Sequence, residues 1–371
     1  MFKAKKGHNP DYIFVSCVAL LAIFGFLALS SASSDLAKIK FNDTYFYLKH
    51  QFFYGLIFGI IGFFIASNFY YQNLKKIAIP FLLINIILLV LVFTPLGFAN
   101  KGAARWLHIG SFSFQPAEFL KLSFIIYIAA WLGGKKFGSQ KGSSDFTEIF
   151  FPFVAVSGLI AALILAQPAT TIFMIIMVSV LIIYFVSGAR ISHFLGFIFL
   201  GLAVLSLVVY SSPYRYQRVA SYFDKSAESN ATTRYQLNQS LTAIGSGGLF
   251  GIGFGKSTIK YKYLPESIGD SIFSVIAEEF GFLGAIFLIS VFLVLFYRGL
   301  LIAQKSGDAF GRLLSIGFVS IIAIQVFIHI AANSGLLPLT GVPLPFISYG
   351  GTALAVFLTM MGIVVNISKY T

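Results

Sequence analysis

The sequence predicts an all-α integral membrane protein with ten transmembrane helices and a long extracytoplasmic loop between helices seven and eight. Hydrophobic residues make up 58% of the 371-residue chain and charged residues only 11%, whereas a soluble domain carries about 25% charged residues. Apolar runs of about 20 residues, the length that crosses the hydrocarbon core of a bilayer, recur along the chain. Residues 1–371 are therefore predicted to form a single polytopic membrane domain.

The spans follow from these apolar runs and their interruptions. The first run follows a basic stretch, MFKAKKGHNP, and ends in SSASSDL without a small-residue cleavage motif, so an uncleaved first span is expected. Gln167, Pro168 and Ala169 separate the fifth and sixth spans, because Pro168 cannot continue a helix. The predicted spans are residues 12–30, 50–67, 77–95, 114–133, 150–167, 169–187, 192–211, 271–297, 311–333 and 344–367.

The distribution of Lys and Arg predicts the orientation in the membrane. With a cytoplasmic N-terminus, the inner segments hold thirteen Lys and Arg and the short outer loops hold five. The long loop, residues 212–269, places seven more outside, but long loops translocate largely regardless of charge. Both termini are thus expected in the cytoplasm. The net charge of +13 is explained by this orientation and by anionic lipid, and the scattered basic residues predict no nucleic-acid partner.

Cysteine and cofactor chemistry are nearly absent from the sequence. Cys17 is the single cysteine, so an intramolecular disulfide is impossible, and no His lies near enough to suggest a metal site. Cys17 is predicted to be a small buried apolar residue of the first span. No tightly bound cofactor is expected, and a need for a divalent cation, Mg²⁺ or Mn²⁺, cannot be derived from the sequence.

Residues 101–121 form the first of three places whose polarity lipid would not tolerate. Glu118 and Lys121 lie three residues apart and share a helix face, so they can pair. An unpaired charge at that depth costs about 3 kcal/mol or more. The pair either fixes helix packing or lines a substrate path. Arg105 and Trp106 are expected at the outer interface, where Trp is common and Arg can bind phosphate through two hydrogen bonds.

The second place is the glycine-rich end of the long loop, residues 243–266, which carries Lys256, Lys260 and Lys262. Gly255-Lys256-Ser257 matches the end of a nucleotide-binding P-loop, but Phe250 replaces its first glycine, so no nucleotide site is predicted. A glycine-rich backbone beside lysines suits a phosphate-bearing ligand. A solvated basic loop is the alternative.

Four carboxylates, those of Glu266, Asp270, Glu278 and Glu279, crowd into residues 261–281, where the eighth span begins. Asp270 is either a plain helix N-cap or a general base at the membrane mouth, with its protonation tuned by partial desolvation. On a continuous helix Glu278 would lie about 12 Å deeper on the same face, which requires a polar interior. Glu278 and Glu279 are predicted to be buried packing partners, and Glu266 a positioning or structural group.

The third place, residues 329–351, contains three prolines and then Ser348-Tyr349-Gly350-Gly351 at the predicted start of the last span. Irregular backbone at membrane depth is tolerated only where it is buried or lines a cavity. Ser348 as a nucleophile would need a His and an acid. His329 is available, but no acid lies near it in sequence, so this alternative is disfavoured.

These stretches resemble the SEDS proteins (shape, elongation, division and sporulation), the family of FtsW, RodA and SpoVE. The likeness is carried by ARWLHIGSFSFQPAEFLKL, by GIGFGKSTIKYKYLPESIGDSIFSVIAEEFGFLG and by NSGLLPLTGVPLPFISYGGTAL, and the layout of spans extends it over essentially the whole chain. The resemblance implies the SEDS fold and a peptidoglycan glycosyltransferase. Such enzymes polymerise lipid II, a disaccharide-pentapeptide on undecaprenyl pyrophosphate, at the outer face of the bacterial cytoplasmic membrane. They work with a class B penicillin-binding protein transpeptidase and other membrane proteins of the division or elongation complex.

The resemblance also implies site residues. The essential aspartate of the family falls on Asp270, as the general base that deprotonates the acceptor sugar 4-hydroxyl. The membrane ion pair falls on Glu118 and Lys121, and the Arg-Trp motif on Arg105 and Trp106. With the basic loop and its neighbours included, the candidate substrate-binding residues are Arg105, Trp106, Glu118, Lys121, Lys256, Lys260, Lys262, Glu266 and Ser348.

Within the family, Gly253, Gly255, Ser257 and Lys260 fit the FtsW pattern and favour a role in division, with RodA-type elongation or SpoVE-type sporulation as alternatives. Two departures stand out: Ala169 replaces the acid that follows proline in many members, and the neighbours of Asp270 differ from the usual TDFIF. A lipid II flippase would instead need charged groups on a path through both leaflets. A non-catalytic scaffold that recruits a transpeptidase would not need Asp270.

Overall fold

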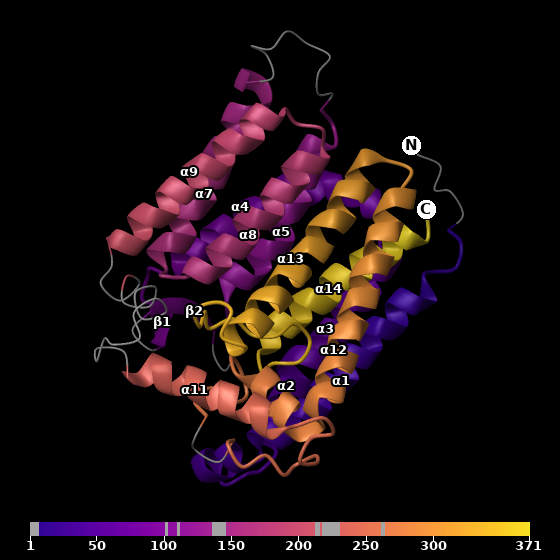
Figure 1. The fold of residues 1–371 in the computed structure, drawn as a ribbon. Coiled ribbons are helices and arrows are strands. Elements are labelled where there is room, and N and C mark those ends of the chain that lie inside the picture. Colours follow the sequence, from indigo (N-terminus) through magenta and orange to yellow (C-terminus); the bar gives the residue numbers. More distant parts are fainter. Residues whose placement is uncertain are drawn as a thin grey trace.

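The computed structural model describes residues 7–100, 103–109, 112–135, 146–211, 216, 231–260 and 264–371. Long helices run side by side, and α11 lies across the end of the molecule opposite to both termini (Figure 1). The α-helices are α1 (Tyr12–Phe41), α2 (Phe46–Gln51), α3 (Ile57–Asn68), α4 (Leu74–Leu91), α5 (Pro116–Leu132), α7 (Phe151–Ala166), α8 (Thr170–Val186), α9 (Ile191–Tyr210), α11 (Ala231–Ser246), α12 (Ile272–Lys305), α13 (Ala309–Asn333) and α14 (Gly351–Ser368). Short π-helical turns at Phe52–Leu56 and Phe146–Phe150 lead into α3 and α7.

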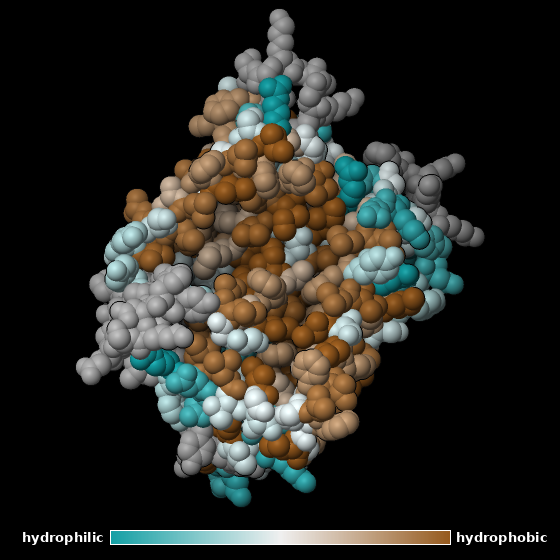
Figure 2. All heavy atoms as spheres, viewed as in Figure 1, coloured by the Kyte–Doolittle hydropathy of each residue, from teal (hydrophilic) through white to brown (hydrophobic). Residues whose placement is uncertain are grey.

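The helices identify a multi-pass membrane protein. Each predicted span contains a helix, and eight of the described helices are long and apolar enough to cross a membrane. α8 is apolar but has 17 residues, and α5, also 17 residues long, carries the charged side chains of Glu118 and Lys121. The predicted number of ten spans is therefore not confirmed. Apolar side chains cover much of the face drawn in Figure 2, with hydrophilic residues gathered toward the ends.

Three predicted boundaries are wrong. The eighth span was expected to end at residue 297, but α12 continues to Lys305. The first span was expected to end at residue 30, but α1 continues to Phe41, because the polar residues beyond the apolar run still form helix. The last span was expected from residue 344, but α14 begins at Gly351. The Leu344 N–H donates to Ser348 Oγ at 2.7 Å, which closes a turn in place of the first turn of a helix.

The all-α prediction also needs two additions. A small antiparallel sheet orders the segment before α5: β1 (Gly97–Asn100) pairs with β2 (Ala103–Ile109), which pairs with β3 (Phe112–Phe114). In its register Phe98 lies opposite Trp106. The segment predicted as a long loop contains the helix α11. Neither the sheet nor α11 forms an apolar run of the length that crosses a bilayer, so the hydropathy of the sequence did not predict them.

Small residues allow α3 and α14 to pack backbone against backbone. A Cβ added to Gly59 would lie 3.2 Å from Ala355 Cα, and one added to Gly362 would lie 2.5 Å from the carbonyl oxygen of Phe63. Lipid gives little hydrophobic drive for helix association, so such close van der Waals packing is a principal source of stability in a membrane.

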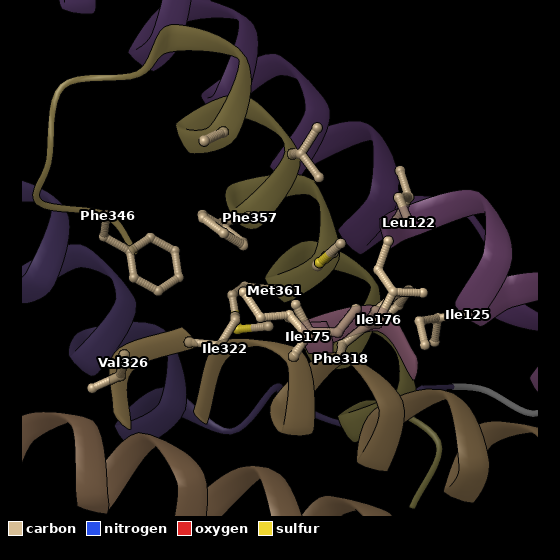
Figure 3. Close-up of a cluster of buried hydrophobic side chains, with 14 of the residues drawn as sticks. Leu122, Ile125, Ile175, Ile176, Phe318, Ile322, Val326, Phe346, Phe357 and Met361 are labelled. Atoms are coloured by element: carbon tan, nitrogen blue, oxygen red, sulfur yellow. The ribbon is translucent and has the colours of Figure 1, made fainter. Parts of the chain in front are cut away.

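The core beneath the candidate site is built from α5, α8, α13 and α14 together with one residue of the loop before α14. Phe346 of that loop points at Phe357 of α14 (Figure 3), with ring centroids 5.8 Å apart. The other labelled side chains of the cluster are Leu122, Ile125, Ile175, Ile176, Phe318, Ile322, Val326 and Met361. This packing fixes the positions of α5 and α13, which carry the polar residues described below.

Gly281 interrupts α12 where the glycine-rich loop crosses it. Its φ of 69° and ψ of −167° belong to a region open essentially to glycine only. Its Cα faces Gly251, since an added Cβ would lie 2.2 Å from the Gly251 nitrogen. Hydrogen bonds from Ile252 N to Glu278 O (3.0 Å) and from Phe282 N to Gly248 O (2.9 Å) join loop and helix on either side of the interruption.

Gly281→Ala is expected to destabilise the protein by about 2 kcal/mol or more, because the side chain is strained at this φ and ψ and collides with Gly251. Gly201→Ala in α9 is the matched control, since an added Cβ there meets nothing within 4 Å and Ala is the better helix former. Thermal unfolding of the purified variants in detergent measures both effects. Equal midpoints for the two variants would contradict the role given to Gly281.

Candidate active site

Asp270, just before α12, lines a small polar cavity together with residues of α11, α13 and the loop before α14. The cavity has a volume of about 20 Å³ and is lined by Asp270, Gln236, His329, Ala332, Asn333 and residues 339–342. Asp270 is partly exposed. The N-cap of α12 is Ser271, whose side chain makes no capping hydrogen bond, so Asp270 lies one residue before the cap.

Three successive carbonyl groups hold the backbone that leads into Asp270. The Ile268 oxygen accepts from Tyr349 N at 2.8 Å, the Gly269 oxygen from Ser348 Oγ at 2.7 Å, and the Asp270 oxygen from Asn333 Nδ2 at 2.8 Å. The donors belong to the loop before α14 and to the end of α13. The carboxylate is therefore carried by a backbone that tertiary contacts fix at each residue.

Asn333 is the most heavily used of these donors. Its side chain is buried, it donates to the carbonyl oxygens of Asp270 and His329 (2.8 and 2.9 Å), and its Oδ1 accepts from Ser274 Oγ at 3.1 Å. It thus joins the last turn of α13 to both sides of the start of α12.

Asn333→Ala is expected to loosen the segment around Asp270, because a buried carbonyl left without a donor costs about 1–3 kcal/mol. Hydrogen–deuterium exchange should accelerate at the amides of Gly269 and Ser271, both of which donate to Glu266 O in a turn. Asn68→Ala, which removes an exposed bond to Phe64 O, is the control. Unchanged exchange at Gly269 and Ser271 in the Asn333 variant would refute this role.

Ser348 has a structural place in the same network. It is buried, its Oγ donates to Gly269 O, and it accepts from Leu344 N. These contacts support a positioning role for Ser348, and its predicted contact with substrate stays a prediction. His329 bonds elsewhere, to Val342 O, so the structure shows no Ser348–His329 pair.

Glu118 and Lys121 form a buried ion pair that reaches the loop beside the cavity. Lys121 Nζ lies 2.8 and 2.9 Å from the two Glu118 carboxylate oxygens and 2.9 Å from Gln325 Oε1. Gln325 in turn donates to Pro343 O at 2.9 Å, and both charged side chains are at most 5% exposed. Because a buried charge needs a partner, this arrangement ties α5 to α13 and to the loop. Of the two roles left open by the sequence, the contacts support helix packing.

Arg105 clamps the turn between α7 and α8. Its Nε donates to Gln167 O at 3.1 Å and its Nη2 to Pro168 O at 2.5 Å. Beyond that turn, Thr171 Oγ1 donates to Thr340 O at 3.0 Å, and Thr340 lines the Asp270 cavity. Arg105 is thereby connected to the cavity wall through the turn, and Trp106 beside it is partly buried in β2.

Comparison with known proteins supports the family that the sequence motifs suggested. The family model of cell cycle proteins named for FtsW, RodA and SpoVE matches residues 11–371. The chain belongs to this family. Stage V sporulation protein E of Bacillus subtilis (strain 168) is 37% identical over 99% of both chains. A probable peptidoglycan glycosyltransferase FtsW of Geobacter sp. (strain M18) is 36% identical over 96% of both.

Solved structures show the same fold. Rod shape determining protein RodA of Thermus thermophilus superposes with a TM-score of 0.71, at 26% identity and over 98% of each chain. A chain from a study of how a peptidoglycan synthase complex coordinates polymerization and crosslinking gives a TM-score of 0.79, at 25% identity and over 97% of each chain. The FtsW/RodA/SpoVE fold therefore covers essentially all of this protein.

Lys260, a candidate substrate-binding residue, is buried in an ion pair in this structure, and its contact with substrate stays a prediction. Lys260 is 6% exposed and pairs with Glu279 Oε1 at 2.9 Å. It also donates to Ser31 Oγ of α1 at 2.8 Å. The loop folds back onto α12, because the buried Glu279 carboxylate requires a cation.

Glu278 and Glu279 are buried, as predicted, and polar groups surround both carboxylates. Glu278 accepts from Ser257 Oγ and, at 3.2 Å, from Thr258 N. Both donors belong to the glycine-rich loop, so the loop itself satisfies the carboxylate. The packing of the loop against α12 is a tertiary contact that the sequence does not indicate.

Among the remaining candidate residues, the described Lys256 and Glu266 do not line the Asp270 cavity. Lys256 and Glu266 are exposed, and the Glu266 carbonyl closes the turn before Ser271. Lys262 lies outside the described residues. Within the described part of the chain, no three His, Cys, Asp or Glu side chains gather closely enough to hold a metal ion.

Reasoning from the sequence missed the polar stripe of α13. Gln325, His329 and Asn333 follow one another at intervals of four, so they lie on one face of an otherwise apolar helix. All three are buried and each contacts the cavity wall or the loop beside it. Their spacing was the signal that could have identified them.

Proposed function

We propose that this protein is a peptidoglycan glycosyltransferase that polymerises lipid II at the outer face of the cytoplasmic membrane. The observation that carries the proposal is Asp270: a partly exposed residue on a fixed backbone whose side chain lines a polar cavity, in a chain of the FtsW/RodA/SpoVE family. Relatives matching nearly the full chain at 35–36% identity are named probable peptidoglycan glycosyltransferases.

In the proposed reaction, Asp270 is the general base. Its carboxylate accepts the proton of the acceptor sugar 4-hydroxyl while that oxygen attacks the anomeric carbon of the donor. The bond between this carbon and the pyrophosphate oxygen breaks, and the undecaprenyl pyrophosphate leaves with the electron pair. The three bonds to the carbonyls of residues 268–270 hold the base in place, and such positioning is itself a large part of catalysis.

The donor and the acceptor each carry a pyrophosphate group, and cationic side chains are needed to balance the negative charge of both. Among the described lysines of the glycine-rich loop, Lys256 is exposed, whereas Lys260 is committed to Glu279. We therefore assign pyrophosphate contact to Lys256, with Arg105 and Trp106 of the central strand β2 as further candidates. A divalent cation as a counter-charge is a further candidate.

We propose that the protein lies in the membrane with the Asp270 cavity on the outer side and both termini in the cytoplasm. The two termini lie close together at the end of the molecule opposite to α11 and the Asp270 cavity (Figure 1), as the basic residues predict for cytoplasmic termini. We propose a class B penicillin-binding protein as partner, together with other membrane proteins of the complex. A related chain comes from a complex described as coordinating polymerization and crosslinking.

We propose division as the cellular process, because the FtsW-like loop pattern agrees with several relatives named FtsW. Depletion in the native cell tests this directly. Filaments with unfinished septa are expected, whereas rounded cells would indicate elongation, and a defect confined to spore formation would indicate a sporulation role.

The biochemical test is polymerisation of purified lipid II by the purified protein, alone and with its partner transpeptidase. Glycan chains resolved by gel electrophoresis are expected. Transbilayer movement of labelled lipid II without glycan would support a flippase instead. Stimulation of the partner's transpeptidase activity without glycan synthesis would support a scaffold.

A further inference from the structure

His329 lies on α13 with its side chain almost completely buried, at 1% exposure. Its Nδ1 is 2.7 Å from Val342 O. A carbonyl oxygen can only accept a hydrogen bond, so Nδ1 carries a proton. In the neutral ring the other nitrogen, Nε2, is therefore a proton acceptor.

Among the described residues, the Nε2 acceptor of His329 makes no hydrogen bond that stabilises the fold. Nε2 is buried and has no hydrogen-bond partner within the described part of the chain, and a buried polar atom in this condition normally has a functional or solvent explanation. His329 and Val342 line the same cavity as Asp270. Its volume of about 20 Å³ exceeds the roughly 10–15 Å³ that one water needs.

The polar side chains one turn before and one turn after His329 on α13 already form hydrogen bonds with other groups. One turn below on α13, Gln325 binds Lys121, whose charge is balanced by Glu118. One turn above, Asn333 binds the carbonyl of Asp270. Among the residues that line the cavity, the titratable side chains are therefore His329 and Asp270.

We propose that His329 Nε2 is the proton acceptor that returns Asp270 to its carboxylate form after each sugar addition. The inference rests on the proposed glycosyltransferase function. The acceptor hydroxyl loses its proton to Asp270 as the glycosidic bond forms and the pyrophosphate leaves. The proton then passes from the Asp270 carboxylic acid through one water in the cavity to Nε2, forming an imidazolium whose Nδ1–H still donates to Val342. Release of that proton to solvent at the cavity mouth completes the cycle.

A processive polymerase gains directly from such a group. The general base must lose its proton before the next addition, and the growing glycan covers the route from Asp270 to bulk water. A buried acceptor that lines the same cavity gives the proton a place to go while the substrate is bound.

The test is chemical rescue of His329→Ala in the lipid II polymerisation assay. The substitution leaves an imidazole-sized space beside the cavity, and kcat is expected to fall about tenfold or more with KM nearly unchanged. Added imidazole should restore most of the rate. Pyrrole, which fills the same space and has an N–H but no acceptor nitrogen, should not.

His329→Asn is the second variant, because its amide N–H can keep the bond to Val342 O while the Nε2 acceptor is lost. Its rate is expected to fall by a similar factor with an unchanged melting temperature. Wild-type rates in both variants, or equal rescue by imidazole and pyrrole, would overturn the inference and leave the glycosyltransferase function standing. Absence of glycan from the wild-type protein with its partner would overturn both.

Discussion

Asp270→Asn is expected to lower the rate of glycan polymerisation by about 10²–10⁴-fold, the range that a positioned general base contributes. The amide has nearly the same shape as the carboxylate but cannot accept the hydroxyl proton at neutral pH. The three backbone hydrogen bonds at residues 268–270 do not involve the carboxylate, so the local fold should be preserved. Lipid II turnover with the partner transpeptidase present measures the effect.

The matched control for this prediction is Asp43→Asn. The Asp43 carboxylate forms an exposed ion pair with Lys49 at 2.8 Å and lies outside the cavity. Lys49 and the Tyr45 N–H lower the pKa of the Asp43 carboxyl, so it is charged at neutral pH just as a base would be. Its substitution should leave polymerisation unchanged, and wild-type activity in Asp270→Asn would remove Asp270 from the mechanism.

Lys121→Met is expected to destabilise the protein by about 3–5 kcal/mol, the second large effect, because it strands the Glu118 carboxylate without its cation. The same substitution also removes the bond to Gln325 Oε1. Since Gln325 holds Pro343 O, the loop that lines the cavity should lose order as well. The apparent unfolding midpoint of the purified protein in detergent measures the loss.

The double variant Glu118→Leu with Lys121→Met separates pairing from position. Replacing both charges with apolar groups of similar size removes the stranded carboxylate, so most of the stability should return. The exposed pair of Asp43 and Lys49 serves again as control, since exposed ion pairs contribute little. If Lys121→Met and the double variant were equally unstable, the pair would not be the source of the stabilisation.

Much of this protein could be predicted from its sequence because the bilayer restricts what a membrane chain can do. Apolar runs marked where helices lie, and Pro168 marked the reversal between α7 and α8, which end and begin at Ala166 and Thr170. The motif around Asp270 identified the family. The spacing of Glu118 and Lys121 predicted the contact that the structure shows at 2.8 Å, because three residues bring side chains onto one helix face.

The contacts between distant segments could not be predicted in the same way. Lys260 belongs to the long loop and Glu279 to α12, and neither the charge count nor the hydropathy indicates that the loop folds back to pair them. Residues 97–114 carry too weak an alternation to predict the sheet. The start of α14 was misplaced because the Ser348 hydroxyl and the Leu344 amide close a turn instead of a helix.

The sequence by itself thus determined the helical membrane class and the family, and it singled out Asp270 as the candidate general base, since hydropathy and local motifs are properties of neighbouring residues. Only the tertiary structure decided how Asp270 is presented. Its backbone is held by Ser348, Tyr349 and Asn333, and its cavity is shared with His329. These groups lie 59 or more residues from Asp270 along the chain, and a hydrogen bond depends on position in space, which the packing of α12, α13 and the loop before α14 provides.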